Sequence, residues 1–250
     1  ELIQLDGQDQ GAPSSSKQSA DLEAVVAQGV DGIVISPNDV AALAPAIQAA
    51  INDLKTRGVA DIVLTNPPFG GKAKIDDSHI LDRYELTRWE FKDERSSLPA
   101  EQLFIETAMN FLKPGGVLAI VLPDGILNNP GLSFIRSWLL KRGQLIASID
   151  LPKTTFRASG GVNNPSVLIV RKFTNEERRN ADNGIINTAY NIFMATPETS
   201  GIDNRIVPIY LRHPDGREKQ DENGNKIKDD QVSVVADSFR QWLTANRTTH

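Results

Sequence analysis

Asp61-Ile-Val-Leu-Thr-Asn-Pro-Pro-Phe-Gly70 is the stretch of sequence that decides the fold. Its apolar residues 62–64 are typical of a buried strand in a parallel sheet, and the run ends abruptly in a polar turn. Two consecutive prolines fix φ and exclude helix for the residue before each, so the turn is held rigid. Ligands of open α/β sheets bind beyond the carboxyl ends of the strands, which makes this turn a candidate functional site.

The flanking sequence predicts strands and helices in alternation. Strands are expected over residues 2–5, 32–36, 117–122, 144–149 and 166–170. Helices are expected from the serine cluster at 14–16 to Gly29 and over 39–51, 99–112, 132–140 and 236–243. A β-hairpin region is expected over 206–235, with turn pairs at Asp215-Gly216 and Asn223-Gly224. The expected fold class is therefore α/β, with a doubly wound, mostly parallel sheet and a small polar hairpin and helix at the C-terminus.

Composition limits the function classes. Forty per cent hydrophobic residues in a chain of 250 suffice for a core, and no apolar run is long enough to cross a membrane. The absence of cysteine and the isolation of the three histidines argue against a metal site. The formal net charge of -5 means that any nucleic-acid contact must be local or shared with a partner. The chain begins in mid-strand and shows no secretion signal, so a cytoplasmic protein is expected.

The sequence N-P-P-F at residues 66–69 resembles the catalytic motif of amino-group DNA methyltransferases. These enzymes methylate an exocyclic amine whose lone pair is delocalised into the base, so the nitrogen must be polarised to react. The resemblance implies that the Asn66 side-chain oxygen and the Pro67 carbonyl accept the two amine hydrogens. Pro68 completes the rigid turn, and Phe69 stacks on a base that has left the duplex. The alternative is a proline-rich strand exit that merely turns the chain.

Three downstream segments resemble the modification subunits of type I restriction systems: residues 101–106, 112–116 and 122–125. The resemblance implies an adenine N6-methyltransferase with S-adenosylmethionine as donor, DNA as substrate, and a specificity subunit and a restriction subunit as partners. It also implies that Phe156 packs on the target base opposite the catalytic turn; the alternative is an ordinary loop phenylalanine. Asp124 lines the same site or only forms a turn with Gly125.

Residues 1–52 carry a second resemblance, to periplasmic sugar-binding proteins of the ribose-binding type. It rests on Asp-Gly-Gln-Asp-Gln at 6–10, on the run 28–39 and on Ala-Ile-Gln-Ala-Ala-Ile at 46–51. The first strands of the sheet would then come from a sugar-binding-like segment. Cofactor-binding residues are unknown, because Gly7, Gly11 and Asp39 only imitate the glycine-rich turn and the acidic residue that hold an adenosine cofactor.

We therefore expect three regions: a sugar-binding-like segment over 1–52, a methyltransferase catalytic half over 53–173 and a polar extension over 174–250. The basic and aromatic stretch between Gly70 and Ser97 is either a DNA-facing lid or a solvated loop. The principal hypothesis is an adenine N6-methyltransferase fragment of a type I modification subunit. The alternatives are an inactive hybrid that lacks the cofactor site and a sugar-binding module of an ABC transporter.

Overall fold

The computed structural model describes residues 2–6, 32–36, 58, 60–67, 74–89, 97–156 and 165–246. The chain divides into two compact units. Unit 1 comprises Glu1–Ile146 and Leu168–Thr188, and unit 2 comprises Ala147–Val167 and Ala189–His250. In the part that the structure describes, no helix is long and apolar enough to cross a membrane.

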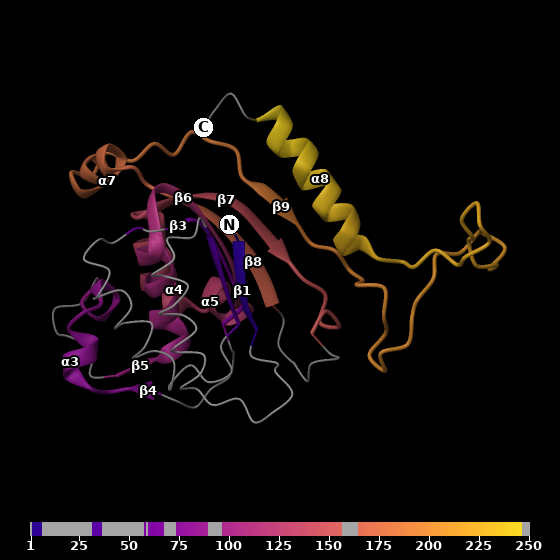
Figure 1. Ribbon diagram of the computed structural model, residues 1–250, viewed down its shortest axis with the longest axis horizontal. Coiled ribbons are helices and arrows are strands. Elements are labelled where there is room, and N and C mark those ends of the chain that lie inside the picture. Colours follow the sequence, from indigo (N-terminus) through magenta and orange to yellow (C-terminus); the bar gives the residue numbers. More distant parts are fainter. Residues whose placement is uncertain are drawn as a thin grey trace. The chain divides into compact units, whose positions relative to one another are not determined.

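The main element is a seven-stranded sheet (Figure 1). Its spatial order is β1 (Leu2–Asp6), β2 (Gly32–Ser36), β3 (Ala60–Thr65), β6 (Leu112–Pro123), β8 (Pro165–Lys172), β7 (Gly143–Asp150) and β9 (Phe193–Ala195). The first four strands pair in parallel, as do β7 and β9. Strands β7 and β8 are antiparallel, since main-chain hydrogen bonds join Phe173 to Arg142 at one end and Leu151 to Pro165 at the other. The prediction of a mixed α/β fold with a mostly parallel sheet is confirmed.

The order of the first strands differs from that of a doubly wound sheet. Strands β1, β2, β3 and β6 lie side by side in chain order, and the order reverses only at β7 and β8. In a doubly wound sheet the reversal comes next to the first strand and opens the crevice that holds ligands. Apolar runs identify strands but not their neighbours, so sequence patterns alone could not reveal this order.

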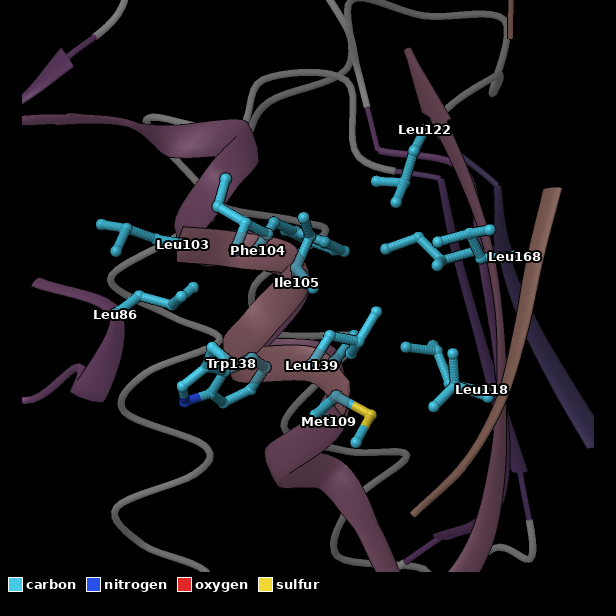
Figure 2. Packing of buried hydrophobic residues seen from close by; sticks show 14 of the residues in the cluster. Leu86, Leu103, Phe104, Ile105, Met109, Leu118, Leu122, Trp138, Leu139 and Leu168 are labelled. Carbon is cyan, nitrogen blue, oxygen red and sulfur yellow. The ribbon is translucent and has the colours of Figure 1, made fainter. Parts of the chain in front are cut away.

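The core of unit 1 lies between helix α4 (Ala100–Phe111) and the sheet. Side chains alternate across a strand, and in β6 the buried positions Leu118, Ile120 and Leu122 face the same side. Figure 2 shows Leu118 beside Met109 of α4 and places Ile105 on the side of Leu122. Helix α4 therefore runs antiparallel to β6, as a crossover between parallel strands requires.

Strand β6 begins earlier than the sequence indicated. The Pro-Gly-Gly segment 114–116, expected to separate helix from strand, lies inside β6. A Cβ atom on Gly116 would lie 2.9 Å from the Asp61 carbonyl oxygen, and Gly115 has φ +85°. These glycines allow the backbone to pass close to β3 and to turn where other residues would be strained.

Residues 74–89 form secondary structure and contribute side chains to the core. The sequence had indicated only a DNA-facing lid or a solvated loop for the stretch 70–97. Residues 74–89 contain strand β4 (Lys74–Ile75), helix α3 (Ser78–Leu81) and helix η1 (Glu85–Thr87), and β4 pairs antiparallel with β5 (Leu98–Pro99). Leu81, Tyr84 and Leu86 are buried in the core. The apolar residues of this stretch are few and irregularly spaced, so no periodicity revealed them.

The other helices in the described part of unit 1 follow β6 and β8. They are α5 (Asp124–Asn128), η2 (Pro130–Leu132), α6 (Ser133–Leu140) and α7 (Asn175–Asp182). Helix α7 begins with a capping box, in which the Thr174 side chain accepts from the Glu177 N–H and the Glu177 carboxylate accepts from the Thr174 N–H.

Unit 2 contains helix α8 (Gln231–Ala245) beside β9 (Figure 1). Phe193 of β9 packs against Phe239 and Trp242 of α8, with ring centroids 5.1 and 5.9 Å away. Between β9 and α8 the chain forms isolated antiparallel bridges around three tight turns, with no continuous strand in residues 196–230. Gly216 and Gly224 of the expected turn pairs both have positive φ. Helix α8 starts five residues before the predicted helix, because Asp230 caps the Val232 and Ser233 N–H groups.

Candidate active site

The predicted catalytic turn begins where β3 ends. Thr65 is paired with Ile35 of β2 and with Ile120 of β6, so Asn66 and Pro67 lie at the carboxyl edge of three parallel strands. Pro68 and Phe69 lie outside the described residues. The sequence prediction that a strand leads directly into Asn66 is confirmed. The prediction that its apolar residues 62–64 are all buried is wrong, because alternation across the strand buries Val63 and leaves Ile62 and Leu64 47% and 37% exposed. The catalytic roles of residues 66–69 stay predictions.

The Asn66 side chain holds an unpaired acceptor. Its Oδ1 atom is buried and has no hydrogen-bond partner, and the next residue, Pro67, is also buried. Most buried polar atoms are paired, and an unpaired one costs about 1–3 kcal/mol of stability. Such a cost is commonly retained where a ligand supplies the missing partner. The unpaired carboxamide oxygen therefore suits a site for an N–H donor.

Asp124 lies at the same edge as Asn66. It begins helix α5 directly after β6, which is parallel to β3. Its Oδ2 atom accepts a hydrogen bond from Asn128 Nδ2 at 2.7 Å, within the same short helix. The parallel register thus places Asp124 where a site residue would be, and its bond to Asn128 gives it a local structural role as well.

Phe156, the predicted base-stacking residue, belongs to unit 2. It lies in the turn that follows β7 and is partly exposed. The neighbouring Thr155 Oγ1 is buried without a hydrogen-bond partner, and Thr154 Oγ1 lies 2.8 Å from Ser200 Oγ. An aromatic side chain in a turn beyond a strand is available for stacking, and its role on the target base stays a prediction.

The candidate cofactor residues Gly7, Gly11 and Asp39 lie outside the described residues. The sheet order still limits their roles, because β2 and not β1 is the neighbour of β3. The segment next in sequence to β2 is Pro-Asn-Asp at residues 37–39, which has no glycine, whereas Gly7 and Gly11 follow the outer strand β1. The strand adjacent to the catalytic turn is thus not followed by a glycine-rich turn.

Helix α4 supplies two buried polar residues that are not among the predicted site residues. Glu106 is buried, and its two carboxylate oxygens accept from the Glu85 and Leu86 N–H groups, each at 2.9 Å. Gln102 is buried one turn earlier, and its Oε1 atom has no partner. Gln102 and Glu106 are four residues apart and lie on the apolar face of the helix, so both side chains point into the interior. That pattern was the signal that could have identified both residues.

A cluster of charges lies at the opposite edge of unit 1. Glu85 Oε2 accepts from Arg142 Nε at 2.8 Å and from Trp138 Nε1 at 2.9 Å, and Arg178 Nη2 lies 3.3 Å from Glu85 Oε1. Burial alone would raise the pKa of Glu85, but the hydrogen bonds from Arg142 and Trp138 outweigh it and hold that pKa below its usual value.

The same residues line a cavity of about 200 Å³, with Pro114 of β6 and Lys172 of β8. Pro114 lies near the amino end of β6, away from the carboxyl edge that carries Asn66. The charges of the cluster are paired with one another. Through Glu85, the segment after the catalytic turn is bound to Arg142, which follows α6, and to Arg178 of α7. In the described part of the chain, no group of three or more histidine or acidic side chains is placed to hold a metal ion.

A model of the N-6 DNA Methylase family matches residues 43–248, which is more than half of the chain. The chain belongs to the N-6 DNA methylase family. The match includes all of the described strands from β3 onward and the whole N-P-P-F turn. It also includes residues 43–52, which the sequence analysis had assigned to a sugar-binding-like segment, and the comparisons lend that segment no support.

Individual relatives of this methylase chain are distant. Defense against restriction protein B of Escherichia phage P1 is 24% identical over 139 residues, which are 56% of this chain and 6% of that protein. A type I restriction-modification methyltransferase subunit from Streptococcus thermophilus is 22% identical, with a TM-score of 0.44, over 72% of this chain and 31% of that chain. A modification subunit assigned to a type I restriction enzyme of Vibrio vulnificus YJ016 is 22% identical, with a TM-score of 0.46, over 85% and 36%. The chain thus spans a small part of each relative's length.

Proposed function

We propose that the chain carries the catalytic half of a DNA adenine N6-methyltransferase, as part of the modification subunit of a type I restriction-modification system. The observation that carries the proposal is the unpaired Asn66 oxygen at the carboxyl edge of β3, in a chain of the N-6 DNA methylase family. The catalytic half would occupy residues 53–173, and residues 174–250 would form a polar extension.

The chemistry follows from the two acceptors of the turn. The Asn66 carboxamide oxygen and the Pro67 carbonyl oxygen accept the two hydrogens of the exocyclic amine. Electron density on the nitrogen rises as it becomes tetrahedral, and the amine becomes a nucleophile without a strong base. The rigid Pro67-Pro68 turn holds both acceptors in place, so most of the rate comes from positioning. S-adenosylmethionine, when bound, supplies the electrophilic methyl group.

The aromatic residues hold the base. Phe69 directly follows the two prolines, and Phe156 follows β7. A target adenine must leave the duplex before an enzyme can reach its amine, and stacking on aromatic rings repays part of the cost of unstacking. We assign Phe69 and Phe156 to that role.

The net charge of the chain indicates that it binds DNA together with partner subunits. With a net charge of -5 the chain is a poor DNA binder by itself, because phosphate contacts need local positive charge. We therefore include a specificity subunit that selects the DNA, and a restriction subunit, in the proposed assembly.

The second candidate is a hybrid that folds without transferring a methyl group. The strand order favours it. In an adenosine-cofactor site the strand next to the catalytic strand is followed by a glycine-rich turn, but here the neighbour of β3 is β2, which is not followed by such a turn. In that case residues 1–52 would complete the sheet and hold no cofactor. A sugar-binding module is a weaker candidate, because the family match begins at residue 43.

Calorimetric titration with S-adenosylmethionine separates these candidates. The proposed enzyme binds the donor, and the hybrid does not. Transfer of a tritiated methyl group to adenine-containing DNA, measured with and without a specificity subunit, then tests the reaction. Donor binding and transfer that needs the specificity subunit would support the proposal. Absence of donor binding would support the hybrid.

A further inference from the structure

Gln102 is a second carboxamide with an unpaired acceptor. It lies in the first turn of α4 with only 6% of its surface exposed, and its Oε1 atom has no hydrogen-bond partner. Gln144 is a natural comparison, since it is 7% exposed and its Oε1 accepts from Arg171 Nη2 at 2.8 Å. A buried glutamine in this protein can therefore find a partner. Burial alone therefore does not explain why the Gln102 oxygen is unpaired.

The topology brings Gln102 to the edge that carries Asn66. Helix α4 connects β3 to β6 and runs antiparallel to them, so its first turn lies toward the carboxyl ends of both strands. Figure 2 agrees, since Phe104 and Ile105 of α4 lie on the side of Leu122, near the end of β6. In the part of unit 1 that the structure describes, the two carboxamide oxygens that are buried without a partner thus lie at one edge of the sheet.

The two side chains complement each other chemically. A carboxamide has one accepting oxygen and one donating nitrogen of almost equal size, and half a turn of the group exchanges their positions. Asn66 can therefore direct its oxygen to a ligand and its N–H to a buried acceptor. Gln102 Oε1 is such an acceptor, and it lacks a donor.

We propose that Gln102 is a positioning residue for Asn66: when the target base binds, Gln102 Oε1, unpaired in the ligand-free chain, accepts a hydrogen bond from Asn66 Nδ2, and Asn66 Oδ1 accepts one from the target amine. This inference rests on the proposed function and adds a residue to it. The resulting chain of hydrogen bonds polarises the Asn66 oxygen and fixes its direction. It also gives each of the two unpaired acceptors a donor once the base is bound.

Unfolding of the ligand-free chain provides the first test. Gln102→Met removes the unpaired amide oxygen and preserves length and volume, so we expect the unfolding midpoint to rise by about 2–4 °C. Gln144→Met, the matched control, removes an amide that is bonded to Arg171 and should lower the midpoint. If Gln102→Met lowers the midpoint as the control does, Gln102 is an ordinary structural amide and the inference is wrong.

Methyl transfer provides the second test. Gln102→Met should lower kcat by about 100-fold through misplacement of Asn66, with the KM for DNA and the affinity for S-adenosylmethionine nearly unchanged. Gln102→Glu keeps an accepting oxygen and should restore most of the rate. A Gln102→Met variant with the wild-type kcat would overturn the inference while the proposed function stands.

The two tests also distinguish the two proposals. A wild-type chain that binds donor and DNA with its specificity subunit but transfers no methyl group would refute the proposed function. The unfolding comparison requires no turnover, so it decides independently whether Gln102 holds an unpaired amide oxygen.

Discussion

Asn66 combines a structural disadvantage with a chemical use. Its buried, unpaired oxygen destabilises the folded chain, and the same oxygen is the acceptor that an exocyclic amine needs. Natural proteins retain locally unfavourable groups chiefly at functional sites. The two properties can be separated by measuring stability and activity on the same variant.

Asn66→Ala should abolish methyl transfer, because the amine then loses one of its two acceptors. The free energy of unfolding should stay the same or rise by about 1 kcal/mol, since an unpaired buried group is removed. Donor affinity should be nearly unchanged. Tritium transfer, denaturant titration and calorimetry provide the three values, with Asn180→Ala on the exposed surface of α7 as the control. Residual transfer at the wild-type rate would remove Asn66 from the mechanism.

Ile206 illustrates backbone strain at a single residue. It has φ +65°, a conformation that branched side chains rarely adopt, in a turn stabilised by a hydrogen bond from its N–H to the Asp203 carbonyl oxygen. Gly216 and Gly224 occupy the corresponding place in the next two turns, where a positive φ costs nothing.

Ile206→Gly should therefore stabilise the chain by about 0.5–1 kcal/mol, because relief of strain exceeds the entropy that glycine adds to the unfolded state. Val207→Gly is the matched control: both side chains are 49% exposed, but Val207 has no positive φ. The control should lose stability. Urea titration of both variants measures the difference, and a loss in Ile206→Gly equal to that of the control would contradict the strain argument.

At the scale of elements, α4 anchors the segment that follows the catalytic turn. The Glu106 carboxylate caps the first two N–H groups of η1, and the Tyr84 hydroxyl lies 3.1 Å from Thr107 Oγ1. Burial raises the pKa of Tyr84, so its hydroxyl stays protonated and uncharged through the neutral range. Residues 84–87 are thus bound to the helix by polar contacts as well as by packing.

Glu106→Gln should lower the free energy of unfolding by about 1–3 kcal/mol. The glutamine amide has one oxygen and one NH₂ group, so one of the two backbone N–H groups loses its acceptor and faces a second donor. Hydrogen exchange of the Glu85 and Leu86 amides should accelerate locally. Glu176→Gln, an exposed glutamate in the first turn of α7, is the control and should change stability by less than about 1 kcal/mol. Equal effects of the two substitutions would show that the cap contributes no more than a surface charge.

At the scale of the whole molecule, acid stability depends on paired carboxylates. Hydrogen bonds from Arg171 lower the pKa of Glu177 to about 2, and the Arg142 and Trp138 hydrogen bonds lower that of Glu85 despite its burial. A folded-state pKa below the unfolded value means that the stabilisation is present above about pH 4.5, the unfolded pKa, and is lost as the pH falls toward 2. Both carboxylates are partly exposed, so solvent screens each contribution.

We expect the free energy of unfolding to decrease between about pH 4.5 and pH 2 and to be flatter from pH 5 to 7. In Arg171→Met the decrease should be smaller, because Glu177 loses the main cause of its low pKa. Denaturant titrations at a series of pH values measure both curves. Identical slopes for wild type and variant in the acidic range would contradict the assignment.

The sequence predicts those features of the fold and the site that depend on neighbouring residues. The strands ending at Ser36 and Thr65 and the helix near 100–111 were predictable, because apolar runs and helical spacing are local signals. The place of Asn66 directly after a strand followed from the same signal. The ordered segment 74–89 was not predictable, since its buried residues are isolated and are held by the distant Glu106.

The sequence by itself determined the strand that ends in N-P-P-F, the family to which that motif belongs and the absence of cysteine chemistry, because all three are properties of neighbouring residues or of composition. Only the tertiary structure decided the order of the strands, the pairing of Glu85 with Arg142 and Arg178, and the position of Gln102 at the edge of Asn66. Each of these joins residues distant in the chain. Such contacts depend on how elements pack, and no local pattern of residue types encodes their partners.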